Sequence, residues 1–300
     1  MPKYFSYSSE RIFRKICVPL ILILVVIQVT TSCAPKNLVS QPDTAQSSDT
    51  PTAYPIVDSS QNSTSFEFNQ GAAMLPASQN DLAGLSNAPR YNIDLRINSD
   101  DRSFEGRSQV DYTNTEDVDL NILYFRLLPN GGKSYGSGSL TVNRVLVDGE
   151  PVQSQLSEHG TVLAVPLTAN LSPSDSVQIT FDFVGQVPDV GRDGEDSNGY
   201  GIFSYNQDVM ALAGWYPILA VYDEDGWNLD PVSSIGDSVY SDIAFYNLLV
   251  TAPGDLVVIT TGIEVGREGT ADAVSTQFVS GPVRDFFLIM SPDFEVETST

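Results

Sequence analysis

The feature that most restricts the fold of this chain is a strict alternation of apolar and polar residues that begins at Tyr91. From Tyr91 to Ile97 every second residue is large and apolar, and Asn92, Asp94 and Arg96 lie between them. Successive side chains of a β-strand point to opposite faces, so this alternation predicts a strand with one face in a core. A polar stretch and a second apolar run at 104–112 follow, which together predict a β-hairpin.

The same kind of pattern recurs along the rest of the chain, and no stretch carries a helical apolar stripe with caps. Asp148-Gly149 predicts a tight hairpin turn after Val147. Short strands separated by Gly, Pro, Asn and Asp turns indicate an all-β fold, an antiparallel sandwich or saddle-shaped sheet over residues 90–300. Further strands are expected at 120–128, 140–147, 161–165, 176–184, 243–252, 256–262, 274–279 and 285–290.

The first 32 residues have the pattern of an export signal. Four basic residues precede an apolar run over 16–29, which Pro19 and Gln28 interrupt. A membrane-spanning helix needs roughly 20 apolar residues, so this run favours a signal peptide over a permanent span. Residues 29–33, Val-Thr-Thr-Ser-Cys, resemble a bacterial lipoprotein cleavage box, although Thr30 stands where Leu is usual.

We therefore expect Cys33 to be lipidated and the protein to be held outside the cytoplasm as a membrane-anchored lipoprotein of the cell envelope. The alternative is cleavage by an ordinary signal peptidase, with Cys33 incidental. The only other cysteine, Cys17, lies in the apolar run, so the exported chain has no internal disulfide.

Composition separates a tether from a globular part. Residues 33–89 are rich in Ser, Thr, Gln, Asn, Pro and Ala, which predicts a flexible polar tether ahead of the folded domain at 90–300. Removing residues 1–32, which hold four of the 15 basic and one of the 38 acidic residues, leaves a formal net charge of −26. Such a charge repels phosphate backbones, so nucleic acid is not expected as a partner, and membrane contact is expected through the lipid anchor.

Several short patterns resemble catalytic or metal motifs but lack the context these need. His159, the single histidine, is expected in a hairpin turn. Ser134 sits in a G-x-S-x-G match with no helix after it, so a nucleophile is not expected there. The acidic loop with Asp193, Glu195 and Asp196 does not have the calcium hand-loop spacing. We predict no catalytic residue, no cofactor and no metal ligand in this chain.

The most distinctive candidates for a ligand surface are aromatic. The sequence groups four rings with flanking acids, and packing in a core is the competing and favoured interpretation. If they are exposed, the acids suit recognition of a free amino group, and the rings suit a peptide cleft or a carbohydrate platform. The candidates are Trp215, Tyr216, Tyr222, Trp227 and Asp225.

Three blocks of sequence carry a resemblance to a known family. They are YNIDLRINSDDRSFEGRSQVDYTN (91–114), GWYPILAVYDEDGWNLDP (214–231) and GPVRDFFLIMSPDFEV (281–296). In this order and spacing they resemble the N-terminal β domain of the aminopeptidase N-like (gluzincin) zinc metallopeptidases, in the divergent bacterial branch. In that family a catalytic domain follows, with an H-E-x-x-H helix and a downstream Glu around zinc.

The resemblance implies an N-terminal domain that caps the substrate cleft of an envelope-anchored zinc aminopeptidase. The implied partners are the catalytic domain of the same polypeptide, which would hold zinc, and a peptide substrate. One histidine cannot supply the two imidazole ligands, so this chain alone should be inactive. We expect a fragment of a longer enzyme, and the alternative is a stand-alone surface lipoprotein with a β-sandwich binding or interaction module.

The family also implies one polar side chain that meets the amino end of the peptide, shortly before the Tyr-Pro step. Asn206, Gln207 and Asp208 lie in the right stretch before Tyr216-Pro217. The resemblance does not decide among them, and turn residues are the favoured interpretation.

Overall fold

The computed structural model describes residues 70–132, 135–190, 201–233 and 239–297. The described part is mostly β-structure, an all-β sandwich as the alternation predicts. Its largest sheet has eight strands in the order β16-β17-β14-β1-β2-β8-β4-β5. Their bounds are β1 (Arg90–Asn98), β2 (Ser103–Thr113), β4 (Ser139–Val147), β5 (Glu150–Pro151), β8 (Ser176–Gln186), β14 (Phe245–Ala252), β16 (Ile263–Gly269) and β17 (Val274–Val279).

Two four-stranded sheets and a short hairpin complete the described part. One sheet has the order β15-β18-β10-β9 and the other β11-β3-β7-β6, and β12 pairs with β13. Their bounds are β3 (Leu120–Arg126), β6 (Gln155–Ser157), β7 (Val162–Leu171), β9 (Phe203–Asn206), β10 (Val209–Leu212), β11 (Ile218–Leu219), β12 (Tyr222–Asp223), β13 (Gly226–Trp227), β15 (Val257–Thr260) and β18 (Leu288–Ser291).

Both smaller sheets pack against the large sheet through aromatic side chains. Phe125 of β3 meets Phe181 of β8 with ring centroids 4.6 Å apart. Phe104 of β2 meets Phe203 of β9 at 6.2 Å. These rings are buried and belong to one core, because the inward side chains of all three sheets meet there.

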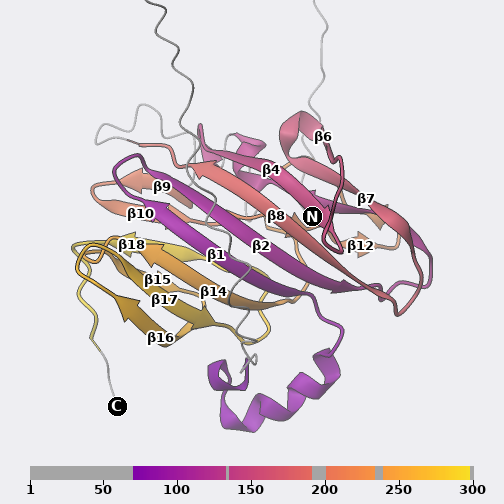
Figure 1. Cartoon of the computed structure of the whole chain (residues 1–300), viewed down its shortest axis with the longest axis horizontal. Coiled ribbons are helices and arrows are strands. Elements are labelled where there is room, and N and C mark those ends of the chain that lie inside the picture. Colours follow the sequence, from indigo (N-terminus) through magenta and orange to yellow (C-terminus); the bar gives the residue numbers. More distant parts are fainter. Residues whose placement is uncertain (1–69, 133–134, 191–200, 234–238, 298–300) are drawn as a thin grey trace, which may run out of the picture. The chain divides into compact units, whose positions relative to one another are not determined.

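The predicted hairpins form where the local sequence demands them. β1 pairs antiparallel with β2, and in Figure 1 these strands lie side by side with β8 and β4. Asp148 and Gly149 have φ values of 50° and 85°, so both adopt the left-handed conformation of a two-residue hairpin turn between β4 and β5.

One strand pairing differs from the antiparallel expectation. β1 pairs parallel with β14, with Tyr91 opposite Tyr246 and Leu95 opposite Val250. The two strands are far apart in sequence, and their alternating patterns fit either orientation. Only the path of the intervening chain decides the pairing.

The chain just before β1 contains structure where a tether was expected. Two 3-10 helices, η1 (Gln70–Ala73) and η2 (Pro76–Leu85), precede β1 and are drawn in indigo in Figure 1. Gln70 is buried and Met74 lies against Gly281, so this segment contacts the sheet domain. The other described 3-10 helices are η3 (Leu128–Gly131) and η5 (Glu158–Gly160).

Candidate functional site

Trp215 and Tyr216 are core residues and not part of an exposed surface. Both residues lie in the segment that connects β10 to β11, and both side chains are fully buried. The indole Nε1 of Trp215 donates a hydrogen bond of 2.8 Å to the carbonyl oxygen of Phe286. These two residues therefore follow the favoured interpretation, packing in a core, and not the ligand surface, because rings with no exposed area and a paired polar atom cannot meet a ligand.

Tyr216 is tied into a buried network of hydroxyl groups. Its hydroxyl donates to the Tyr246 hydroxyl at 2.9 Å and accepts the backbone N–H of Phe286 at 3.2 Å. Tyr91 stacks on Tyr246 with centroids 4.9 Å apart, and its hydroxyl accepts the N–H of Leu219 at 3.0 Å. Burial raises the pKa of Tyr216 and of Tyr246 well above 10.0, so both stay neutral.

Tyr222 and Trp227 have a different environment on the same stretch of sequence. They face each other across the β12–β13 hairpin, and their rings meet edge to face at 5.2 Å. Tyr124 of β3 lies behind Trp227 at 5.8 Å. Both Tyr222 and Trp227 are half-buried, while Asp225 is exposed at the hairpin tip.

Tyr222 and Trp227 line a pocket of about 340 Å³, which we name the aromatic-acidic pocket. It combines three aromatic rings with two carboxyl groups, and no Lys, Arg or His is among its lining residues. The side chains that give it this character are Tyr112, Glu116, Tyr222, Trp227 and Asp242. Another part of its wall comes from the end of η2 and the residues after it, Gly84, Leu85, Asn87, Ala88 and Pro89.

Sequence reasoning identified only part of this pocket. Tyr222 and Trp227 were among the predicted surface residues, and Asp225 does not line the pocket. Tyr112 was expected only as the end of a strand, and Glu116 and Asp242 belong to no motif. Only their proximity in space identifies these three residues as part of a pocket, and a single sequence does not contain that information.

The two carboxyl groups act on the same region. The pKa of Tyr112 is raised first by burial and then by the negative charges of Glu116 and Asp242. Partial burial raises the pKa of Asp242 itself, and the positive charge of Arg284 opposes that shift. Arg284 does not line the pocket, and its guanidinium donates to the carbonyl of Ser241 at 2.7 Å.

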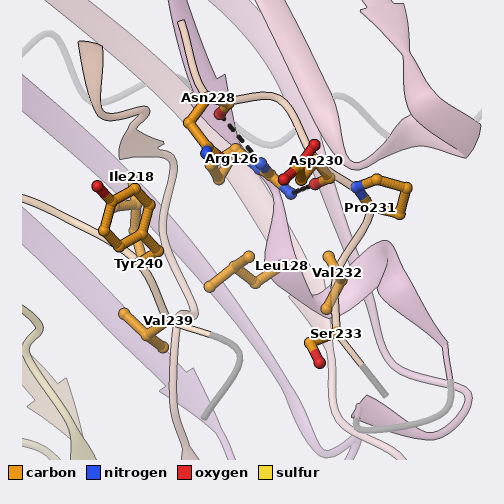
Figure 2. Close-up of a pocket in the computed structure, with 10 residues that line it drawn as sticks. All are labelled: Arg126, Leu128, Ile218, Asn228, Asp230, Pro231, Val232, Ser233, Val239 and Tyr240. Carbon is orange, nitrogen blue, oxygen red and sulfur yellow. Dashed lines mark hydrogen bonds between the residues drawn. The ribbon is translucent and has the colours of Figure 1, made fainter. Parts of the chain in front are cut away.

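Figure 2 shows a second pocket, of about 280 Å³, next to Arg126 of β3. The guanidinium donates from Nη1 to the carbonyl of Asn228 at 3.3 Å and from Nη2 to that of Asp230 at 2.5 Å. Burial lowers the pKa of Arg126, and the negative charge of Asp230 opposes that shift. Arg126 thus fixes the chain after the β12–β13 hairpin to β3, a structural role.

The wall of this second pocket is described in part. It is lined by Ser233 and Val239, and residues 234–238 between them lie outside the described residues. We therefore assign no ligand to it.

The described residues do not fit a zinc site. Among them, no group of three or more His, Cys, Asp or Glu side chains is close enough to hold a metal ion. His159 is exposed, with φ of 57°, in the turn between β6 and β7, as expected for a hairpin-turn residue.

Ser134, the acidic loop with Asp193, Glu195 and Asp196, and Cys33 lie outside the described residues. In the part of the chain that is described, no helix has the length and apolar character needed to cross a membrane.

The polar residues before the Tyr-Pro step form a turn. Gln207 and Asp208, with φ of 49° and 64°, connect β9 to β10, where Asn206 pairs with Val209. The Tyr205 hydroxyl donates to Asp208 at 2.7 Å. The turn interpretation is confirmed, because a two-residue hairpin of this type needs left-handed residues at both positions.

No family model and no curated protein matches the sequence. Among solved structures, the chain is similar to the M1 zinc metallopeptidase from Deinococcus radiodurans, with 15% identity and a TM-score of 0.48. It is also similar to a two-domain M1 zinc metallopeptidase mutant bound to L-tryptophan, with 15% identity and a TM-score of 0.49. A third similar structure is a mutant of the Deinococcus radiodurans enzyme bound to a Tyr-Ser-Ala substrate, with 13% identity and a TM-score of 0.47.

Each of these alignments covers 68% of this chain and 42% of the solved chain. The part of those proteins that matches is their N-terminal domain. The chain therefore spans less than half the length of these solved proteins. Likeness at this identity concerns the fold and does not transfer an activity.

Proposed function

We propose that this chain is the N-terminal domain of an envelope-anchored zinc metallopeptidase of the aminopeptidase type, and that it caps the substrate cleft. The catalytic domain, with zinc and the residues that act on the peptide, would be encoded beyond Thr300. In this proposal the chain contributes part of the cleft wall, and the peptide bond is broken by residues of the other domain.

One observation carries this proposal. The three sequence blocks that resemble the family meet in a single buried cluster. Tyr91 of the first block, Tyr216 of the second and Phe286 of the third are joined through Tyr246 by ring contacts of 4.9 to 5.7 Å. The blocks thus specify one structural core, which is what a common fold would require of separated similarities.

Export and anchoring are part of the same proposal. A signal peptide over residues 1–32 and a lipid on Cys33 would hold the domain at the outer face of a membrane. Mass spectrometry of the native N-terminus tests this directly. An unmodified cysteine, or a cleavage site elsewhere, would contradict the lipid anchor.

The first experiment is to sequence the source DNA through the codon for Thr300. A frame that continues into H-E-x-x-H and a downstream Glu supports the proposal. The complete product should then hydrolyse an aminoacyl p-nitroanilide, lose that activity with a zinc chelator, and regain it with added zinc. A stop codon directly after Thr300 would contradict the proposal.

The aromatic-acidic pocket favours a second candidate, a stand-alone surface lipoprotein whose sandwich binds a ligand without chemistry. The described domain already contains a cavity with aromatic and charged side chains, which is the usual composition of a binding site. Binding at this pocket that a chelator leaves unchanged, together with a stop codon after Thr300, would favour this candidate.

A further inference from the structure

The aromatic-acidic pocket brings together rings from separate parts of the chain. Tyr112 ends β2, Tyr222 lies in β12 and Trp227 in β13. The hairpin is short, but Trp227 is fixed on two sides, by the Tyr222 ring at 5.2 Å and the Tyr124 ring at 5.8 Å. Rings that are held in place in this way present a preorganised aromatic wall.

Two polar groups of the residues that line the pocket have no hydrogen-bond partner within the described part of the chain. Among the described residues, neither the indole N–H of Trp227 nor the hydroxyl of Tyr222 takes part in a hydrogen bond. The contrast with Trp215 is direct, because the indole N–H of Trp215 is bonded to Phe286. Buried indoles usually find a partner, whereas those at binding surfaces keep theirs for water or a ligand.

The charge of the pocket is negative. Glu116 and Asp242 line it and no basic residue does. The negative charges of both carboxylates raise the pKa of Tyr112, which lines the pocket with them. The positive charge of Arg284, which does not line the pocket, opposes the rise in the pKa of Asp242. A pocket of this sign excludes anions, in a chain whose formal net charge is already −23.

The side chains that line the pocket suit organic cations better than inorganic ones. Calcium and magnesium need several oxygen ligands at short range, and among the described residues no such group of three or more acids exists. Aromatic faces attract alkylammonium ions by cation–π contact and also bury their methyl groups. The pocket, with a volume of about 340 Å³, has room for a small alkylammonium ion.

We propose that the aromatic-acidic pocket binds a small organic ammonium ion, with the Tyr112, Tyr222 and Trp227 rings around the alkyl groups and Glu116 and Asp242 balancing the charge. The site does not depend on the metallopeptidase proposal, because all of its residues lie in the described domain. Its failure would leave that proposal unaffected.

The test is a calorimetric titration of the full chain, in a non-ionic detergent, with choline as the probe. The uncharged analogue in which carbon replaces the choline nitrogen is titrated in parallel. Choline should bind at least about tenfold more tightly than the analogue, since the analogue has the same shape and lacks the charge. The affinity should fall as sodium chloride is raised.

Four variants assign the binding to these side chains. Trp227→Leu should weaken choline about tenfold, and Trp227→Phe should retain most of the affinity because a ring remains. Glu116→Gln and Asp242→Asn should each weaken it about threefold to fivefold. Asp272→Asn, an exposed acid in the turn between β16 and β17, is the matched control and should leave the affinity unchanged.

Three results would overturn the proposal. The first is equal affinity for choline and the uncharged analogue, which would indicate an apolar cavity only. The second is an affinity that neither Glu116→Gln nor Asp242→Asn alters. The third is the absence of choline binding up to a concentration of tens of millimolar, measured on chain that circular dichroism shows to be folded.

Discussion

Trp215 and Trp227 lie on one short segment of chain, yet their surroundings are opposite. Trp215 has no exposed area, and its indole N–H is bonded to the carbonyl of Phe286. Trp227 is half-buried, and it lines a pocket with its neighbour Tyr222. Similar aromatic and turn-rich sequence is thus buried in the core at one end of the segment and lines an open pocket at the other.

The largest expected change in stability concerns Trp215, the buried residue of this pair. Trp215→Ala should lower the free energy of unfolding by about 3 to 5 kcal/mol, because it leaves a cavity and an unpaired carbonyl in the core. Urea unfolding followed by circular dichroism measures this. A loss below about 1 kcal/mol would mean that the core at Phe286 repacks around the missing ring.

The next effect isolates hydrogen bonding from packing. Tyr216→Phe keeps the ring but removes the partner of the Tyr246 hydroxyl and of the Phe286 N–H, so we expect a loss of about 1 to 3 kcal/mol. Tyr222→Phe is the control. The Tyr222 hydroxyl makes no hydrogen bond among the described residues, and its removal should change stability by less than about 0.5 kcal/mol.

A double-mutant cycle sharpens this result. Tyr216→Phe and Tyr246→Phe should be non-additive, because the two hydroxyls bond to each other at 2.9 Å. Strict additivity would show that the hydroxyl pair contributes nothing beyond what each residue contributes alone.

Trp227→Ala probes the pocket end of the segment and should cost only about 1 kcal/mol of stability, since half-buried apolar area contributes less than a filled core site. The same urea titration provides the value beside that of Trp215→Ala. Equal losses for the two variants would remove the distinction between a core tryptophan and a pocket tryptophan.

The smallest effect concerns pH. Partial burial raises the pKa of Asp242 above 3.8, so its contribution to stability is present below that pH and is lost as the pH rises through the raised pKa. Asp242→Asn should therefore be more stable than the parent at pH 7, by a few tenths of a kcal/mol at most for so exposed a group. The difference should vanish below about pH 3.8.

Several charged and titratable groups act in the same region. The negative charge of Asp242 contributes to the raised pKa of Tyr91 and of Tyr112. Glu116 lines the same pocket as Asp242, and the positive charge of Arg284 favours the ionised form of Asp242. If Asp242→Asn is less stable than the parent at pH 7, the attraction to Arg284 outweighs the cost of burial.

Strand prediction from the sequence succeeded where burial alternates. β1, β2, β8 and β14 have buried residues at nearly every second position, and all four match the expected ranges to within two residues at each end. β16 was missed because almost all its side chains are exposed, so no apolar period marks it. The pairs β9–β10 and β12–β13 were missed because their strands have two to four residues, too few for a period to be read.

The candidate site was predicted less well than the fold, for a physical reason. An aromatic residue favours a core and a binding surface alike, so its type does not distinguish Trp215 from Trp227. Burial depends on what other parts of the chain cover, and here Tyr91, Tyr246 and Phe286 cover Tyr216. For Trp215 and Tyr216 the structure shows the core packing that the sequence favoured over a ligand surface.

The sequence by itself determined the all-β class, the main strands, the tight turns and the acidic charge, because these depend on neighbouring residues. Only the tertiary structure decided the parallel pairing of β1 with β14, the burial of Trp215 and the assembly of the aromatic-acidic pocket. Glu116 and Asp242 are far apart in sequence, and one wall of their pocket comes from residues 84–89, which were expected in a tether. Such long-range proximity is set by how the whole chain packs, and local patterns do not contain it.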